Sequence, residues 1–187
     1  MRTILGVSGS LRRDSWNSKL LSAAAELLPS GFKLEPYDGL KTIPPYDEDD
    51  DRHPAPAAAA DFRAAIAGAD GVLFATPEYN SSVPGQLKNA IDWASRPLAT
   101  NPLRNKPVAV VGASTGAFGA VWAQAELRKV LASTGARVVD GEVALGHAPT
   151  RFDEDGRLAD DGIREQLQEV VSALAAEVEQ RAQLVAA

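Results

Sequence analysis

Residues 72–94 read VLFATPEYNSSVPGQLKNAIDWA and contain a strand, a polar loop and a helix in that order. Val72 to Ala75 is a short continuous apolar run, which is typical of a strand buried on both faces of a parallel sheet. After the loop, apolar residues recur at helical spacing from Leu87 to Ala94. Pro84 falls at the first turn of this helix, where a missing amide hydrogen has no cost. The stretch predicts an α/β fold built from strand–loop–helix units.

The same alternation of strands and helices continues to both ends of the chain. Ile4 to Val7 and Val108 to Val111 are as continuously apolar as Val72 to Ala75. Phe32 to Tyr37 and Arg137 to Leu145 contain interspersed charges, which is typical of edge strands. The five predicted strands therefore divide into three central ones (the first, third and fourth) and two edge ones.

Helical stripes of apolar residues lie beside or between these strands. They cover Leu20–Leu28, Phe62–Ala69, Leu87–Ala94, Leu127–Leu131 and Ile163–Val178. Alternating strands and helices predict a parallel sheet with helices on both faces. The buried first, third and fourth strands match the strand order 2-1-3-4-5. Ligands of such sheets bind at the carboxyl ends of the strands near the switch point, so the loops after these three strands are the informative ones.

Composition indicates an ordinary globular protein and excludes several kinds of site. The chain has 187 residues, 45% apolar and 24% charged, which fits a single domain over residues 1–187. A net charge of −6 argues against a nucleic-acid partner, and no apolar run is long enough to span a membrane. Met1 to Leu5 leads into a strand without a secretory signal, which favours a cytoplasmic location. With no cysteine and only two histidines, His53 and His147, we expect no metal site.

The loop after the first strand, residues 9–18 (GSLRRDSWNS), gathers serines, an asparagine and two arginines at a helix N-terminus. Backbone amides at such a terminus point outward, and the helix dipole favours an anion there. Hydroxyl and amide donors can surround phosphate oxygens, and Arg12 adds a fixed positive charge. Simple capping by Ser15 or Asp14 is the structural alternative, but capping needs only one such residue. The loop therefore predicts a phosphate-binding site.

The loop after the third strand, residues 76–85 (TPEYNSSVPG), is stiffened by two prolines. A rigid loop can present backbone amides and carbonyls to the edge of a planar heterocycle. Tyr79 offers an aromatic face for stacking. A rigid turn without any ligand explains the same residues equally well.

The loop after the fourth strand, residues 112–119 (GASTGAFG), is rich in glycine and alanine, which suits close approach of a flat ligand. Gly112-Ala113-Ser114-Thr115-Gly116 also matches the nucleophile elbow of a serine esterase, with Asp140 or Glu142 and then His147 in the order of a hydrolase triad. That alternative leaves the first two loops without a role and lacks a His-Gly-Gly oxyanion segment. One bound flavin mononucleotide (FMN) uses all three loops, with phosphate in the first and ring between the other two.

Three segments resemble the NADPH-dependent FMN reductases, a family that includes bacterial chromate and quinone reductases. They are residues 9–18, residues 77–93 and residues 112–116, and the resemblance extends over about residues 3–145. It implies a flavodoxin-like three-layer fold, non-covalent FMN, and a homodimer or homotetramer. It also implies ping-pong hydride transfer from NADPH or NADH to flavin, quinone or a similar small acceptor.

Carried over by position, the resemblance assigns cofactor-binding residues in all three loops and no catalytic side chain. The phosphate would be held by Ser10, Arg12, Ser15, Asn17 and Ser18. The flavin ring would be bordered by Pro77, Glu78, Tyr79 and Asn80 on one side and by Ser114, Thr115 and Gly116 on the other. Chromate-reductase-like members often carry an aromatic residue where this chain has Ser81, which affects the expected subunit contacts and acceptor preference.

Other interpretations remain open. A non-catalytic electron carrier of the flavodoxin type would have the same fold, although its phosphate loop is threonine-rich. The acidic run Asp47 to Asp51, followed by His53, could bind a divalent ion, although a solvated loop is the simpler interpretation. Arg13, Arg96 and Arg104 are candidates to meet the 2′-phosphate that distinguishes NADPH from NADH.

Overall fold

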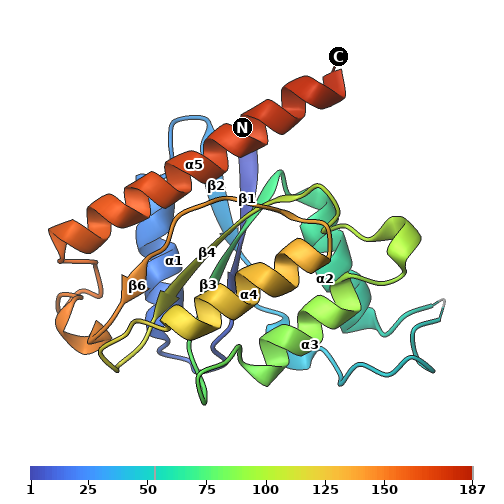
Figure 1. Cartoon of the computed structure of the whole chain (residues 1–187), viewed down its shortest axis with the longest axis horizontal. Coiled ribbons are helices and arrows are strands. Elements are labelled where there is room, and N and C mark those ends of the chain that lie inside the picture. Colours follow the sequence, from blue (N-terminus) through green and yellow to red (C-terminus); the bar gives the residue numbers. More distant parts are fainter. Residues whose placement is uncertain (53, 187) are drawn as a thin grey trace.

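The computed structural model describes residues 1–52 and 54–186 (Figure 1). Its strands are β1 (Arg2–Ser8), β2 (Phe32–Pro36), β3 (Gly71–Thr76), β4 (Pro107–Ala113), β5 (Arg137–Val138) and β6 (Ala144–Leu145). Its α-helices are α1 (Trp16–Leu27), α2 (Ala57–Gly68), α3 (Gly85–Ala94), α4 (Val121–Ser133) and α5 (Asp161–Ala186), with short 3₁₀ turns η1 (Leu40–Thr42), η2 (Leu98–Thr100) and η3 (Ala148–Thr150). His53, at the end of the acidic run, lies outside the described residues.

The sheet is parallel with the strand order β2-β1-β3-β4-β5, which confirms the predicted topology. Alternate side chains of each central strand enter two different cores. Leu73 and Ala75 of β3 pack with α1 and α5, whereas Val72 and Phe74 pack with α2, α3 and α4. The molecule therefore has three layers, and α5 crosses the face that it shares with α1 (Figure 1).

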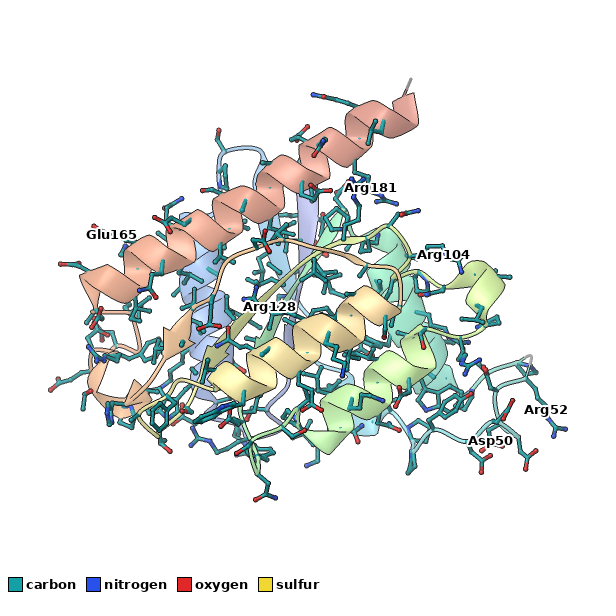
Figure 2. The ribbon with its side chains drawn as sticks, in the orientation of Figure 1. Asp50, Arg52, Arg104, Arg128, Glu165 and Arg181 are labelled. Carbon is teal, nitrogen blue, oxygen red and sulfur yellow. The ribbon has the colours of Figure 1, made fainter. Side chains whose placement is uncertain are left out.

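The last strand differs from the prediction, because the expected continuous run over residues 137–145 is interrupted. β5 and β6 both pair with β4, and Val139 and Val143 each keep one backbone hydrogen bond to β4, but residues 140–142 leave the ladder. Arg128 of α4 occupies the gap, where its Nη2 donates to the carbonyl of Val110 at 3.2 Å and to that of Gly141. Figure 2 shows Arg128 between α4 and the strands, and its burial lowers the pKa of the guanidinium. A helix side chain thus replaces the missing rungs of the ladder.

Charged side chains at the amino edge of the sheet are paired within the protein. Asp70 accepts hydrogen bonds from the Thr3 amide at 2.8 Å and from Arg2 Nη1 at 3.1 Å. Lys106 is only 3% exposed, and its ammonium donates to the carbonyls of Ala69 and Ala67 at the end of α2. Burial lowers the pKa of Lys106 to about 8, because the charged form loses its hydration.

One face of α3 holds the long connection between β2 and α2. Gln86 donates to the carbonyls of Leu40 and Ile43 at 2.8 and 2.9 Å. Asn89 Nδ2 and Trp93 Nε1 both donate to the Pro44 carbonyl, at 2.8 and 2.9 Å. The helical half of the 77–93 motif therefore stabilises the fold rather than contacting the site at the carboxyl ends of the strands.

Within residues 1–52 and 54–186, no helix is both long enough and apolar enough to cross a membrane.

Candidate active site

A cavity of about 200 Å³ lies where β1, β3 and β4 end, at the position predicted from the topology. It is lined by Ser10, Arg12, Ser15, Trp16, Asn17, Pro77, Glu78, Tyr79, Ala113, Ser114 and Thr115. The three loops identified in the sequence therefore converge on one cavity. Nine of the predicted site residues line it.

Ser18, Asn80 and Gly116 were also predicted in the site but are not among the lining residues. Ser18 faces a separate groove between α1 and β2. Asn80 lies at the tip of a hairpin, and Gly116 accepts a hydrogen bond from the amide of His147 at 2.9 Å. Each is one or a few residues from a lining position, so the three predicted loops reach the cavity but these three residues do not line it.

Two lining residues, Trp16 and Ala113, were missed. Trp16 is the first residue of α1, and its ring stacks on Phe152 at a centroid distance of 5.4 Å. Its place inside the polar run 9–18 was the signal that could have identified it. Ala113 ends β4, and only the strand register places it there.

The loop before α1 offers uncommitted donors. In the part of the chain that the structure describes, the amides of Arg13, Asp14 and Trp16 have no hydrogen-bond partner, and Arg12 forms no ion pair. Ser15 caps α1 by accepting from the amides of Asn17 and Ser18 at 3.1 and 3.4 Å. Capping therefore leaves donors available for an anion, since the cap uses one hydroxyl.

Asn17 joins the first loop to the third. Its buried amide accepts from the Ala113 N–H and donates to the Ala113 carbonyl, both at 3.0 Å. Because an amide nitrogen carries two hydrogens, one N–H remains for a ligand. Asn17 thus fixes the start of α1 against the end of β4 while it lines the cavity.

The second loop forms a tight hairpin. Tyr79 and Ser82 exchange two backbone hydrogen bonds of 3.2 Å, and the residues between them, Asn80 and Ser81, have positive φ angles of 53° and 60°. Two left-handed central residues match the twist of a two-residue hairpin. Ser82 Oγ also donates to Glu126 of α4 at 2.6 Å, and this bond lowers the pKa of the Glu126 carboxyl.

Glu78 links the second loop to α4. Its Oε2 accepts from the amides of Trp122 and Ala123 at 3.0 and 3.1 Å. The residue before α4, Ala120, has a left-handed conformation and no side-chain cap. Glu78 therefore caps α4 from outside the helix, which is the favourable position for a carboxylate.

Two of the three glycines in the third loop are explained by packing against the protein. A Cβ on Gly119, whose φ is +58°, would lie 2.1 Å from the backbone of Ala144. A Cβ on Gly112 would lie 2.9 Å from the side chain of Gln124. A Cβ on Gly116 would meet only Ser114 Oγ, at 3.7 Å, so packing within the protein does not require glycine there.

The esterase triad is not assembled. Ser114 Oγ donates to the Gly116 carbonyl at 3.3 Å, and His147 is exposed. Among the described residues no hydrogen bond joins the His147 side chain to Ser114, Asp140 or Glu142. Ser114 also lacks the positive φ that marks a strained elbow.

Exposed aromatic side chains border the cavity. Tyr79, Phe118 and Trp122 are 54%, 64% and 48% exposed, and the last two meet edge to face at 5.1 Å. Large exposed apolar groups gathered in one place indicate a binding surface.

The remaining candidates lie elsewhere. Arg96 and Arg104 line a different cavity between α3 and α4, and Figure 2 shows Arg104 beside the connection that follows α3. The acidic run pairs with arginines instead, with Asp51 bonded to Arg63 at 3.0 Å. No cluster of three metal-ligating side chains occurs within the described ranges.

Comparison with known proteins gives one consistent result. The family model described as NADPH-dependent FMN reductase matches residues 2–150. A curated NAD(P)H-dependent FMN reductase from Pseudomonas aeruginosa is 46% identical over 172 residues, covering 91% of this chain and 92% of that protein. A 2-hydroxy-1,4-benzoquinone reductase from Burkholderia sp. is 42% identical over 176 residues, covering 94% and 95%.

Among solved structures, this chain is similar to FerB, a flavoenzyme NAD(P)H:(acceptor) oxidoreductase from Paracoccus denitrificans. The TM-score is 0.84 at 33% sequence identity, and the match covers 96% of this chain and 98% of that one. The family-model match over residues 2–150 includes the three loops that line the cavity.

Proposed function

The chain belongs to the NADPH-dependent FMN reductase family, and from this premise we propose that it is an FMN-containing oxidoreductase that uses NAD(P)H to reduce flavins, quinones or similar small acceptors. The family expected from the three sequence motifs is thus confirmed. The observation that supports the activity is the convergence of an anion-binding loop and two rigid loops on one cavity.

The donors at one end of the cavity fit the phosphate of FMN. Arg12 and Asn17 line the cavity, Asn17 keeps one N–H for a ligand, and the same loop carries the amides of Arg13 and Asp14. Helix α1 adds its dipole, which favours a dianion at its first turn. We assign Ser10 as a further hydroxyl donor, and Ser15 as the residue that holds the turn.

The other end suits a flat ring. Pro77 and Glu78 approach it from one loop and Ser114 and Thr115 from the other, with Tyr79 exposed beside them. The cavity of about 200 Å³ is smaller than the roughly 300–1,000 Å³ of pockets that enclose whole ligands, so part of the ring must stay accessible.

Bound FMN supplies the chemistry of accepting and donating hydride. The residues that line the cavity would orient FMN, and NAD(P)H and the acceptor would reach the accessible part of its ring in turn. This arrangement supports a ping-pong order. We propose no acid–base side chain, because hydride transfer to and from the flavin ring requires none.

The experiment that tests this function is steady-state turnover. The purified protein should show a flavin absorbance spectrum, or acquire one on addition of FMN, and should consume NADPH continuously when a quinone is supplied. A non-catalytic electron carrier would bind FMN but oxidise NADPH only once per flavin. A protein that takes up no FMN would contradict the proposal.

We further propose that a second copy of the chain covers the aromatic side chains beside the cavity, giving a homodimer or homotetramer. Tyr79, Phe118 and Trp122 form an exposed apolar rim that would otherwise meet water. Light scattering on the wild type and on Trp122→Glu tests this, and a wild-type monomer would contradict it. A cytoplasmic location, where nicotinamide nucleotides are supplied, belongs to the same proposal.

A further inference from the structure

Two of the eleven residues that line the cavity in the described chain carry a formal charge, and they come from different loops. Arg12 lies on the loop between β1 and α1, at the end that we assign to the phosphate. Glu78 lies on the loop between β3 and α3, at the end that we assign to the ring. The charge nearest the reacting part of the cofactor is therefore negative.

The Glu78 carboxylate is fixed rather than mobile. Its Oε2 accepts two hydrogen bonds from the first turn of α4, from Trp122 and Ala123, at 3.0 and 3.1 Å. These bonds fix the carboxylate of this cavity-lining residue at the first turn of α4, where it masks the positive end of the α4 dipole. Glu78 neutralises the positive end of the α4 dipole and adds a negative charge. Both effects disfavour an anion in the cavity.

We propose that Glu78 sets the reduction potential of the bound flavin, an inference that rests on the proposed function. Transfer of hydride breaks a C–H bond of NAD(P)H, leaves NAD(P)⁺, and adds two electrons and one proton to the ring. The ring therefore gains one negative charge. A fixed carboxylate beside it disfavours that charge, so the cofactor gives its electrons to an acceptor more readily.

Removal of the charge while the hydrogen bonds are kept isolates this effect. Glu78→Gln retains a carbonyl oxygen that can accept from the same two amides of α4. We expect the variant to bind reduced FMN about tenfold more tightly relative to oxidised FMN, because the half-exposed carboxylate acts through partly screened space. For a two-electron couple a tenfold ratio raises the midpoint potential by about 30 mV.

Glu126→Gln is the matched control. Glu126 is also a carboxylate that joins α4 to the second loop, through Ser82 and Val83, but it does not line the cavity. The midpoint potentials of both variants and the wild type are measured against a reference dye, together with the affinity for oxidised FMN. The midpoint potential of Glu78→Gln should rise. In Glu126→Gln the affinity for reduced relative to oxidised FMN should stay within twofold of the wild-type value.

An unchanged potential in Glu78→Gln, or an equal shift in both variants, would overturn the proposal. Glu78→Ala is the second variant, and it too must raise the potential although it also loses the cap of α4. If neither variant folded, Glu78 would be shown to act through stability, and the proposal would fail. A wild type that binds no FMN would overturn the proposed function instead, so the two failures are distinguishable.

Discussion

The two edges of the sheet use their polar residues differently. At the amino edge the charged side chains bond within the protein. Asp70 accepts from Arg2 and from the start of β1, and Lys106 donates to the end of α2. At the carboxyl edge the Arg12 guanidinium and the amides of Arg13, Asp14 and Trp16 have no partner within the described chain. One edge satisfies its charges for stability, and the other keeps donors available for a ligand.

Mutations at the two edges should therefore affect stability and cofactor affinity separately. Substitutions at the amino edge should change the free energy of unfolding and leave cofactor affinity unchanged. Substitutions of uncommitted donors at the carboxyl edge should do the reverse. Residues that belong to the carboxyl edge but bond to the protein, such as Asn17 and Glu126, are the ones that can break this division.

Asn17→Ala should have the largest effect on stability. It leaves the buried N–H and carbonyl of Ala113 unpaired, and each orphaned group costs about 1–3 kcal/mol. We expect the free energy of unfolding of the apoprotein to fall by about 2–4 kcal/mol, measured by urea denaturation. Ser18→Ala, at an exposed neighbour, is the control and should change it by less than about 0.5 kcal/mol.

Weakened FMN binding in Asn17→Ala would show that one residue contributes both to stability and to cofactor binding. The two effects would then not be separated between the two edges of the sheet. A loss of stability below about 1 kcal/mol would contradict the structural role assigned to the Asn17–Ala113 pair.

Lys106→Met tests the amino edge through its pH dependence. The folded-state pKa of about 8 lies below the ordinary value of 10.5, so between these values the unfolded chain binds a proton that the folded protein has released. The stability of the wild type therefore rises with pH in this window relative to the variant. We expect the difference between their free energies of unfolding to change by about 2–3 kcal/mol across it, with FMN affinity equal.

Parallel pH profiles for the wild type and Lys106→Met would contradict the depressed pKa. A change in FMN affinity would show that the amino edge reaches the site.

Much of this arrangement follows from the sequence because it depends on local patterns. The continuous apolar runs identify β1, β3 and β4, and the strand order follows from their burial. The donor-rich loop before α1 can be identified in the same way, because its serines, asparagine and arginines are consecutive in the chain. These features need no knowledge of which distant residues meet.

The rest depends on pairs that are far apart in the chain. Arg128 fills the gap between β5 and β6, and Glu78 caps a helix that begins 43 residues later. No local pattern identifies such partners, so the interrupted strand was missed and the Glu78 side chain was assigned only to the ring. The packing of Gly119 against Ala144 likewise appears only when the two segments are placed together.

Arg12→Ala tests the carboxyl edge. Loss of a charge-assisted contact should weaken FMN binding by about 1.5–3 kcal/mol, measured by fluorescence titration. The unfolding of the apoprotein should change by less than about 0.5 kcal/mol, since Arg12 forms no ion pair with a described residue. Arg104→Ala is the matched control, because Arg104 is also exposed but lines another cavity (Figure 2). Unchanged affinity in Arg12→Ala would remove it from the phosphate site.

Ser82→Ala should have the smallest effect. It tests a residue pair at the carboxyl edge that bonds within the protein instead of facing the cavity. Glu126 lies at the carboxyl edge, yet its carboxylate bonds to Ser82 Oγ and to the Val83 amide rather than facing the cavity. The bond to Ser82 is the first cause of its lowered pKa. The variant should therefore show a Glu126 pKa closer to the ordinary carboxyl value, measured by carbon NMR titration.

The sign of the accompanying stability change is fixed by the direction of that shift. Because the folded-state pKa of Glu126 is lowered, its contribution is present above the ordinary value of 4.5 and is lost as the pH falls through the folded value. Ser82→Ala should reduce this acid-side loss. Ser133→Ala, which removes a hydroxyl from the same helix, should leave the Glu126 titration unchanged. Equal titrations in all three proteins would contradict the role of Ser82 in lowering the Glu126 pKa.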